Sequence, residues 1–410
     1  MAEQKKIHLG LIPKLLIAIV VGILIGRFLP EPVCRLVVTA SGIFSTFLKF
    51  IIPLMILAYV TTGIADLTKG AGKLLLITVL IAYGSTLIAG TFSFLVASGL
   101  FPSFISAEAQ ARIAETAGLT LAPFLQIDVA PILDTMAAVL LAFILGLCLA
   151  VMRGKEITDT LYLAIQDFAA IINLVLHKVI VPFIPLYICG TFVDMTYSGK
   201  TFIILGILWK VFLVVICMHL IYLCVQFAAA GSIAGKNPAK LLKNQIAGYM
   251  TAVGTQSSAA TIPVNLECAK ADGISEQIRN FVVPLCANIH LSGSMITITA
   301  CATAVCLMNR IPISIGVVIP FLMTLGVAMV AAPGAPGGAI MTALPFLYMI
   351  FGREAGDPNG PICALMVALY LTQDSFGTAC NVSGDNAIGV VVDKIYRKWI
   401  LKGESGEVTT

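Results

Sequence analysis

The chain has 410 residues, of which 59% are hydrophobic and only 11% are charged, and its mean hydropathy is +1.00. These values exclude an ordinary soluble domain and indicate a polytopic membrane protein. The formal net charge of +4 gives no reason to expect nucleic acid as a partner. The 11 cysteines show no CxxC spacing and lie mostly in apolar runs, so they indicate neither a disulfide framework nor a metal site.

The first part of the chain is divided into apolar segments of helix length. The predicted spans are Leu11–Leu29, Leu36–Ile64, Leu74–Phe101, Ile132–Met152, Ile157–Cys189 and Phe202–Ala230. Basic residues collect in alternate loops, as at Lys69 and Lys236, whereas the loop over residues 102–131 is acidic. Because cytoplasmic loops carry the excess of lysine and arginine, we expect a multi-pass protein of the cell (inner) membrane with both termini cytoplasmic.

From residue 241 onward the apolar segments are too short, or too often interrupted by polar residues, to be simple transmembrane helices. Leu241–Lys270 has two short apolar arms around GTQSSAATIPVN, with basic residues at both ends, and Ile313–Phe351 has two arms around AAPGAPGGA. Each predicts a re-entrant hairpin that enters and leaves by one face. Phe281–Met308 is interrupted by NIHLSGS, and the last span is also expected to be interrupted. Paired interrupted segments of this kind indicate the binding site of a transporter.

The last span, Leu365–Lys394, carries a polar stripe inside an apolar stretch. At about 100° per residue, Thr378, Asn381 and Asp385 all lie within about 40° of Asp374 around a helix. Two carboxylates at membrane depth cost several kcal/mol, which makes them a functional site by default. The alternative is a pair of structural carboxylates capped by neighbouring hydroxyls.

Three motifs, QSSAATIPVN and PGAPGGAIM in the two tips and QDSFGTACNVSGD in the last helix, resemble those of the dicarboxylate/amino acid:cation symporter family, which includes the glutamate transporters. The similarity covers nearly the whole chain, since the first six spans agree with that family in number, length and spacing. It implies an all-α polytopic membrane protein with eight transmembrane helices and two re-entrant helical hairpins. It also implies a homotrimer in which a transport domain slides like an elevator against a fixed scaffold.

The same resemblance implies how the chain is divided between these two domains. Helices 1 and 2 (1–72) and helices 4 and 5 (132–200) belong to the scaffold. Helix 3 with an external loop (73–131), helix 6 (201–237) and the core of hairpin 1, helix 7, hairpin 2 and helix 8 (238–396) belong to the transport domain, and 397–410 form a cytoplasmic tail.

The resemblance also implies roles for single residues. Asp374 stands where the family holds a substrate ammonium group, and a buried carboxylate suits that task. Asn381 stands where an amide bonds the substrate carboxylate, and Asp385 where a carboxylate binds sodium, with Asn381 beside it. The remaining residues expected to contact substrate are Ser257, Ser258, Ser294 and Thr378.

One departure from the family concerns the substrate. Glutamate and aspartate carriers place an arginine three residues after the ammonium-binding aspartate, and here that position is Gly377. An acidic substrate would leave a second carboxylate unpaired, at a cost of several kcal/mol. A neutral substrate fits better, and the motifs are nearest to those of the serine/threonine branch. Gly377 also leaves open a larger neutral side chain.

The second departure concerns the cations. The family's sodium-binding Asn-Met-Asp-Gly-Thr reads here as His290-Leu291-Ser292-Gly293-Ser294, while Ser85 and Thr86 of the third helix are still present. Because serine stands at position 292 in place of the family's aspartate, we expect one sodium site to be weakened or lost. Because an imidazole can change charge near neutral pH, a proton on His290 is one alternative to the missing sodium. The other alternative is a neutral His290 that forms a hydrogen bond with a backbone carbonyl and has a purely structural role.

Together these features predict a secondary active symporter that imports a small neutral amino acid of the serine or threonine kind, with Na⁺ as the expected coupling ion. The alternative is a symporter for a dicarboxylate or an acidic amino acid, with H⁺ as its coupling ion, and a more remote one is an ion channel. An enzyme is not expected, because neither a His-Glu-x-x-His nor a Gly-x-Ser-x-Gly motif is found.

Overall fold

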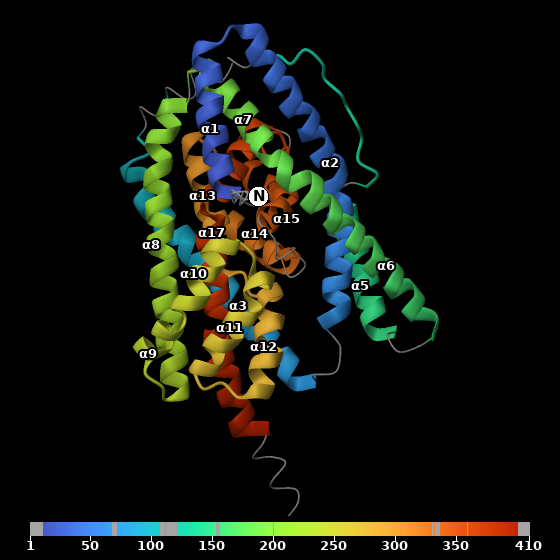
Figure 1. Ribbon diagram of the computed structural model, residues 1–410, viewed down its shortest axis with the longest axis vertical. Helices are drawn as coiled ribbons and strands as arrows, with labels where there is room; N and C mark the ends of the chain where they lie inside the picture. The colour runs from blue at the N-terminus through green and yellow to red at the C-terminus, as the bar shows by residue number, and fades with distance from the viewer. Residues whose placement is uncertain are drawn as a thin grey trace, which may run out of the picture.

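The computed structural model describes residues 11–67, 72–106, 111, 121–133, 135–152, 156–199, 201–329, 332, 337–358 and 360–400. Over these residues all regular secondary structure is helical, as Figure 1 shows. Six of the described helices are long and apolar enough to cross a membrane, which is consistent with a polytopic membrane protein.

The helices of the first part of the chain lie where the apolar segments predict them, within a few residues, except that the fifth span continues to Tyr197 and does not end at Cys189. The fifth predicted span consists of two helices joined by a π-helical turn, Leu176–Ile180, and Pro182 is the second residue of the helix that follows. A proline removes one N–H from the helical ladder, and a wider turn accommodates that loss. The helices are α1 (Leu11–Phe28), α2 (Glu31–Leu67), α3 (Gly72–Leu100), α5 (Thr135–Met152), α6 (Glu156–Val175), α7 (Val181–Tyr197) and α8 (Thr201–Ala234).

Both predicted hairpins are pairs of short helical arms. In the first, α9 (Pro238–Asn244) and α10 (Ile246–Thr255) lead to α11 (Ser258–Ala271) through Gln256, which has a left-handed φ of 54°. In the second, α14 (Ile315–Ala328) leads to α15 (Gly338–Ala343), the short 3₁₀ turn Leu344–Phe346 and α16 (Tyr348–Phe351). Most of the second tip, residues 330–331 and 333–336, lies outside the described residues.

The two long helices near the end of the chain differ in continuity. The predicted interruption of Phe281–Met308 is found, because α12 (Glu276–Ile289) and α13 (Ser292–Met308) are separated at His290 and Leu291. The predicted interruption of the last span is wrong: α17 (Pro361–Ile395) is one continuous helix of 35 residues, followed by a π-helical turn, Tyr396–Ile400. The side chains of Asn381 and Asn386 form hydrogen bonds with neighbouring elements, while the backbone of α17 continues as a helix past both residues.

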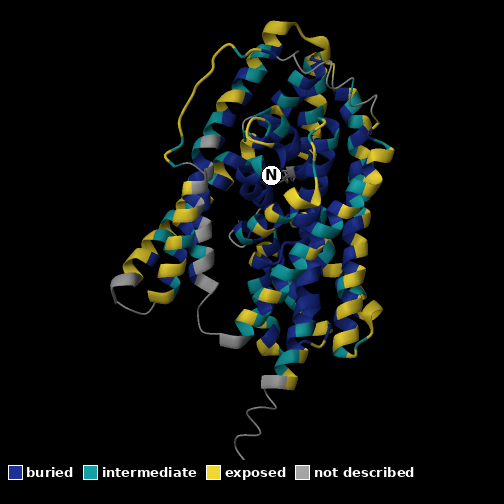
Figure 2. Cartoon of the chain, turned by 180° about the vertical axis from the view of Figure 1, so that it is seen from behind, coloured by how far each residue is buried: buried dark blue, intermediate teal, exposed yellow. Residues whose placement is uncertain are grey.

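The helices pack in two groups. Helices α1, α2, α5, α6 and α7 pack mainly against one another, whereas α3, α8 and α9 to α17 surround α13 and α17. Figure 1 shows α5 and α6 extending away from the second group, and Figure 2 shows the buried residues concentrated around the central helices. Large apolar side chains such as Leu80 and Leu213 are exposed on the outer helices, as expected for surfaces that face lipid.

Candidate functional site

At the break between α12 and α13, the first N–H groups of α13 are hydrogen-bonded by a side chain of α17. The N–H groups of Gly293 and Ser294 donate to Asn381 Oδ1 over 2.7 and 3.3 Å, and Asn381 Nδ2 donates to Ser294 Oγ over 2.9 Å. The first N–H groups of a helix have no partner within it, so an amide oxygen from another element satisfies them here. The structure thus brings Asn381 and Ser294 together, as the sequence predicts for one pocket.

Two glycines allow α13 and α17 to approach closely at the same level. A Cβ on Gly293 would lie 2.3 Å from the carbonyl oxygen of Gly377, and a Cβ on Gly377 would lie 3.3 Å from Thr297 Oγ1. The imidazole of His219 supports this crossing from α8, with Nε2 3.0 Å from both Gly293 O and Thr297 Oγ1. A side chain at Gly377 would therefore have to pass Thr297, so the space expected at Gly377 is narrow.

Asp374 lies one to two turns before these contacts on α17 and is 4% exposed. Its Oδ2 accepts the N–H of Gly337 over 2.7 Å, at the start of the second arm of the second hairpin. Gly337 has a φ of +76°, and a Cβ there would lie 3.0 Å from Leu371, so both backbone and space favour glycine. Among the described residues, no lysine, arginine or histidine forms an ion pair with Asp374. The second hairpin is thus hydrogen-bonded to a buried carboxylate that has no cationic side chain paired with it among the described residues.

The first hairpin places its serines at the start of α11. Ser257 Oγ accepts the N–H of Ala260 over 3.2 Å and so caps α11, while Ser258 is buried. Both arms of this hairpin pack against α17. Thr378 is also buried, one turn after Asp374.

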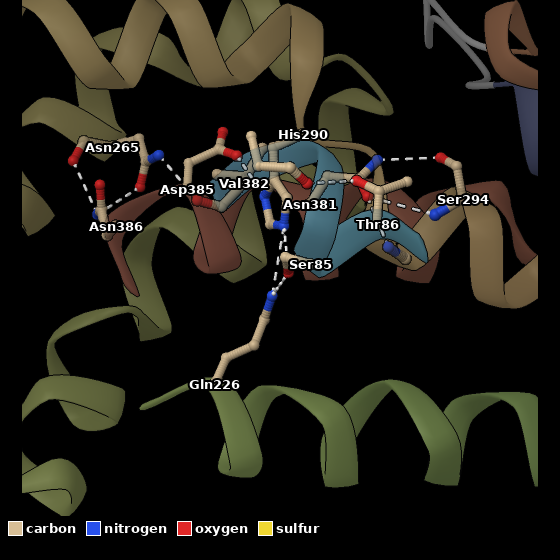
Figure 3. Close-up of polar contacts among 12 residues, drawn as sticks. Ser85, Thr86, Gln226, Asn265, His290, Ser294, Asn381, Val382, Asp385 and Asn386 are labelled. Atoms are coloured by element: carbon tan, nitrogen blue, oxygen red, sulfur yellow. Dashed lines mark hydrogen bonds and ion pairs between the residues drawn. The ribbon is translucent and has the colours of Figure 1, made fainter. Parts of the chain in front are cut away.

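The second predicted carboxylate, Asp385, pairs with the histidine of the interrupted helix (Figure 3). His290 Nδ1 lies 3.0 Å from Asp385 Oδ1, and His290 Nε2 lies 3.1 Å from Ser85 Oγ on α3. Asp385 Oδ2 has no hydrogen-bond partner in the described structure, although Asp385 and His290 are both fully buried. An unpaired oxygen on a buried carboxylate is a feature that a bound cation would explain.

The other two residues predicted at the cation site contribute less. Thr86 Oγ1 donates to the carbonyl of Ala82 within α3 over 2.9 Å. Ser292 is buried and its hydroxyl has no partner in the described structure. The structure therefore joins Ser85, but not Thr86 or Ser292, to the pair of His290 and Asp385.

A polar ladder that the sequence did not indicate fixes the first hairpin to α17. Asn386 Nδ2 donates to Asn265 Oδ1 and to Gln245 Oε1, each over 2.8 Å, and Asn265 Nδ2 donates to the carbonyl of Val382 over 2.8 Å. Gln245 Nε2 continues the ladder to Asp272 Oδ2 over 2.6 Å. Asn386 directly follows Asp385 in an apolar helix, and that adjacency was the available signal.

Asp272 ends this ladder outside the spans, between α11 and α12. Asn244 Nδ2 also donates to it, and Lys236 Nζ donates to its carbonyl oxygen over 2.6 Å. Burial raises the pKa of the Asp272 carboxyl to about 6, although these donors and the lysine charge oppose the shift.

Comparison with known proteins agrees with this architecture. The family model described as "Sodium:dicarboxylate symporter family" matches residues 11–395. The serine/threonine transporter SstT of Acinetobacter baumannii (strain AYE) is 27% identical over 405 residues, which cover 94% of this chain and 97% of that protein. The protein of the same name from Acinetobacter baylyi is 27% identical over 400 residues, covering 95% and 98%.

Proposed function

This chain belongs to the sodium:dicarboxylate symporter family, and we propose that within it the chain imports a small neutral amino acid of the serine or threonine kind. The family is one of cation-coupled transporters and not of enzymes, and we propose Na⁺ as the coupling ion. The full-length similarity to transporters named for serine and threonine supports this substrate class.

The observation that carries the proposal is the uncompensated carboxylate of Asp374. It is almost fully buried, it accepts a hydrogen bond from the tip of the second hairpin, and no described cationic side chain is paired with it. A buried carboxylate without a counter-charge is costly, and a substrate ammonium group would relieve that cost. Binding of the amine at Asp374 would then be linked to the position of the hairpin tip through Gly337.

The surroundings of Gly377 support a neutral substrate. Glycine supplies no positive charge, and the groups nearest to the point that a Cβ would occupy are the Thr297 hydroxyl and the Gly293 backbone. A second substrate carboxylate placed there would lose water without gaining an ionic partner. Hydroxyls and backbone groups of this kind suit a short polar side chain such as that of serine or threonine.

The two packing groups support an elevator mechanism. The group around α13 and α17 holds Asp374, Asp385 and both hairpins, and it corresponds to the proposed transport domain. The group of α1, α2, α5, α6 and α7 corresponds to the proposed scaffold, which in a homotrimer would form the contacts between subunits. Both termini are proposed to lie in the cytoplasm.

Competition for uptake tests the substrate assignment. Purified protein in liposomes is given radiolabelled L-serine under an inward Na⁺ gradient, with excess unlabelled L-threonine, L-aspartate or succinate. The proposal expects competition by L-threonine and little by the two acidic compounds. Stronger competition by L-aspartate or succinate than by L-threonine would support the dicarboxylate alternative instead.

A further inference from the structure

We propose that the imidazole of His290 fills the place of one coupling cation between α3 and α17, so that this chain binds one cation fewer than the same fold would with that space open. The inference rests on the proposed function as a cation-coupled symporter. It concerns the number of coupled cations and not the substrate, so the two can fail separately.

The first step is the position of the imidazole. It lies between a hydroxyl of α3, Ser85 Oγ, and a carboxylate of α17, Asp385 Oδ1, at 3.1 and 3.0 Å. Hydroxyl and carboxylate oxygens are the ligands that a hard cation such as Na⁺ prefers, and the break at His290 also frees backbone carbonyls nearby. The imidazole therefore occupies the space between a hydroxyl of α3 and a carboxylate of α17 in which a cation could otherwise bind.

The second step is the direction of the hydrogen bonds. A carboxylate only accepts, so the Nδ1 of His290 donates to Asp385. The Nε2 of His290 lies 3.3 Å from the amide nitrogen of Gln226, a donor that also donates to Ser85 Oγ over 2.9 Å. These contacts assign the proton to Nδ1 and leave Nε2 as an acceptor. A neutral imidazole with this tautomer satisfies Asp385 Oδ1 without carrying a charge.

The third step is the lack of remaining space. A Cβ on Gly384 of α17 would lie 2.7 Å from His290 Cε1 and 2.8 Å from Gln226 Oε1. The imidazole thus reaches the backbone of α17, and His290 itself is 0% exposed. The imidazole therefore takes up the space between Ser85 Oγ and Asp385 Oδ1. The unpartnered Oδ2 of Asp385 remains free for one cation on its other side.

Equilibrium binding of ²²Na⁺ to the purified full-length protein, without substrate, tests this inference. His290→Asn opens the space and places an amide oxygen at its edge, so we expect the variant to bind one more Na⁺ per chain than the wild type. The double variant His290→Asn/Ser85→Ala removes the hydroxyl ligand and should return to the wild-type number. His177→Asn makes the same exchange at an exposed histidine and serves as the matched control.

Transport gives a second readout that uses the same variants. If the additional ion is coupled, a tenfold increase in Na⁺ should lower the KM for L-serine about tenfold more in His290→Asn than in the wild type. His290→Gln replaces His290→Asn if the latter does not fold. A variant that binds no more Na⁺ than the wild type, or a gain that survives the removal of Ser85, would overturn the inference. Absence of L-serine uptake with a gain of bound Na⁺ would refute the substrate and leave the inference standing.

Discussion

Replacement of Asp374 by asparagine separates the charge of this side chain from its hydrogen bonding. The amide oxygen of asparagine can still accept the N–H of Gly337, which Asp374 Oδ2 accepts over 2.7 Å. The second hairpin should therefore still close in the variant. What is lost is the negative charge, at a position that is only 4% exposed.

The size of the expected loss follows from the burial of the ion pair that Asp374 would form with the substrate ammonium group. Removing one member of a buried ion pair costs about 3–5 kcal/mol, because the other charge is left without a partner. At about 1.4 kcal/mol per factor of ten, kcat/KM for an amino acid should fall by about two to four orders of magnitude. A substrate without an amine would lose nothing from this term.

The assay is uptake of radiolabelled L-serine into liposomes that contain Asp374→Asn or wild-type protein. Asp393→Asn, near the C-terminal end of the same helix, is the matched control, since Asp393 already has the half-exposed Arg397 as its ionic partner and also accepts hydrogen bonds from Ser275. The guanidinium of Arg397 is open to solvent and an asparagine oxygen can still accept from Ser275, so the control should keep uptake within about fivefold of the wild type. Unchanged uptake in Asp374→Asn would refute the assignment of Asp374 to the amine and would favour a mono- or dicarboxylate as substrate.

Three further variants test other parts of the structure. Gly377→Arg should weaken inhibition by L-threonine, because the side chain fills the narrow space beside Thr297. It should admit L-aspartate in competition assays if the guanidinium extends past Thr297 and pairs with a second carboxylate. A wild type that already prefers L-aspartate to L-serine would contradict this view of the pocket. Gly293→Ala should lower the stability by about 1–3 kcal/mol or more, because its Cβ would lie 2.3 Å from a backbone oxygen of α17, whereas Gly42→Ala meets nothing within 4 Å and should unfold thermally like the wild type. Because the pKa of Asp272 is about 6 in the folded protein and 3.8 for an ordinary aspartate carboxyl, the native state binds more protons between these values, and its stability should fall as pH rises from about 4 to 6. Thermal unfolding of Asp272→Asn should lack this fall, and an identical pH profile in both proteins would exclude Asp272 as its origin.

The hairpins and the interrupted helix could be predicted from the sequence because their signals are local. Ser- and Gly-rich tips between short apolar arms, with basic residues at both ends of the first, specify a segment that enters and leaves by one face. The continuity of α17 could not be predicted in this way. Its polar residues resemble those of a broken helix, but Asp374 and Asn381 form hydrogen bonds through their side chains with other elements, and the helix itself is continuous.

The contacts within the candidate site join residues far apart in the chain, and most of them could not be predicted from the sequence. Polar periodicity placed Asp374, Asn381 and Asp385 on one face, but it gave no indication that His290 would contact Asp385 from 95 residues away. The position of Asn386 beside Asp385 could mark it as unusual, but its partners Gln245 and Asn265 lie 141 and 121 residues earlier and could not be predicted from the sequence. The glycine contact between Gly293 and Gly377 depends on how two helices cross, which a sequence without tertiary contacts does not specify.

Concentrative uptake tests the central claim of cation-coupled transport of a neutral amino acid most directly. Liposomes that contain the purified protein are loaded with potassium and diluted into sodium or into potassium, with radiolabelled L-serine outside. We expect L-serine to accumulate above its external concentration only in sodium, and to leave again when the Na⁺ gradient is collapsed by an ionophore. Uptake that merely equilibrates, at the same rate with and without the Na⁺ gradient, would contradict the account.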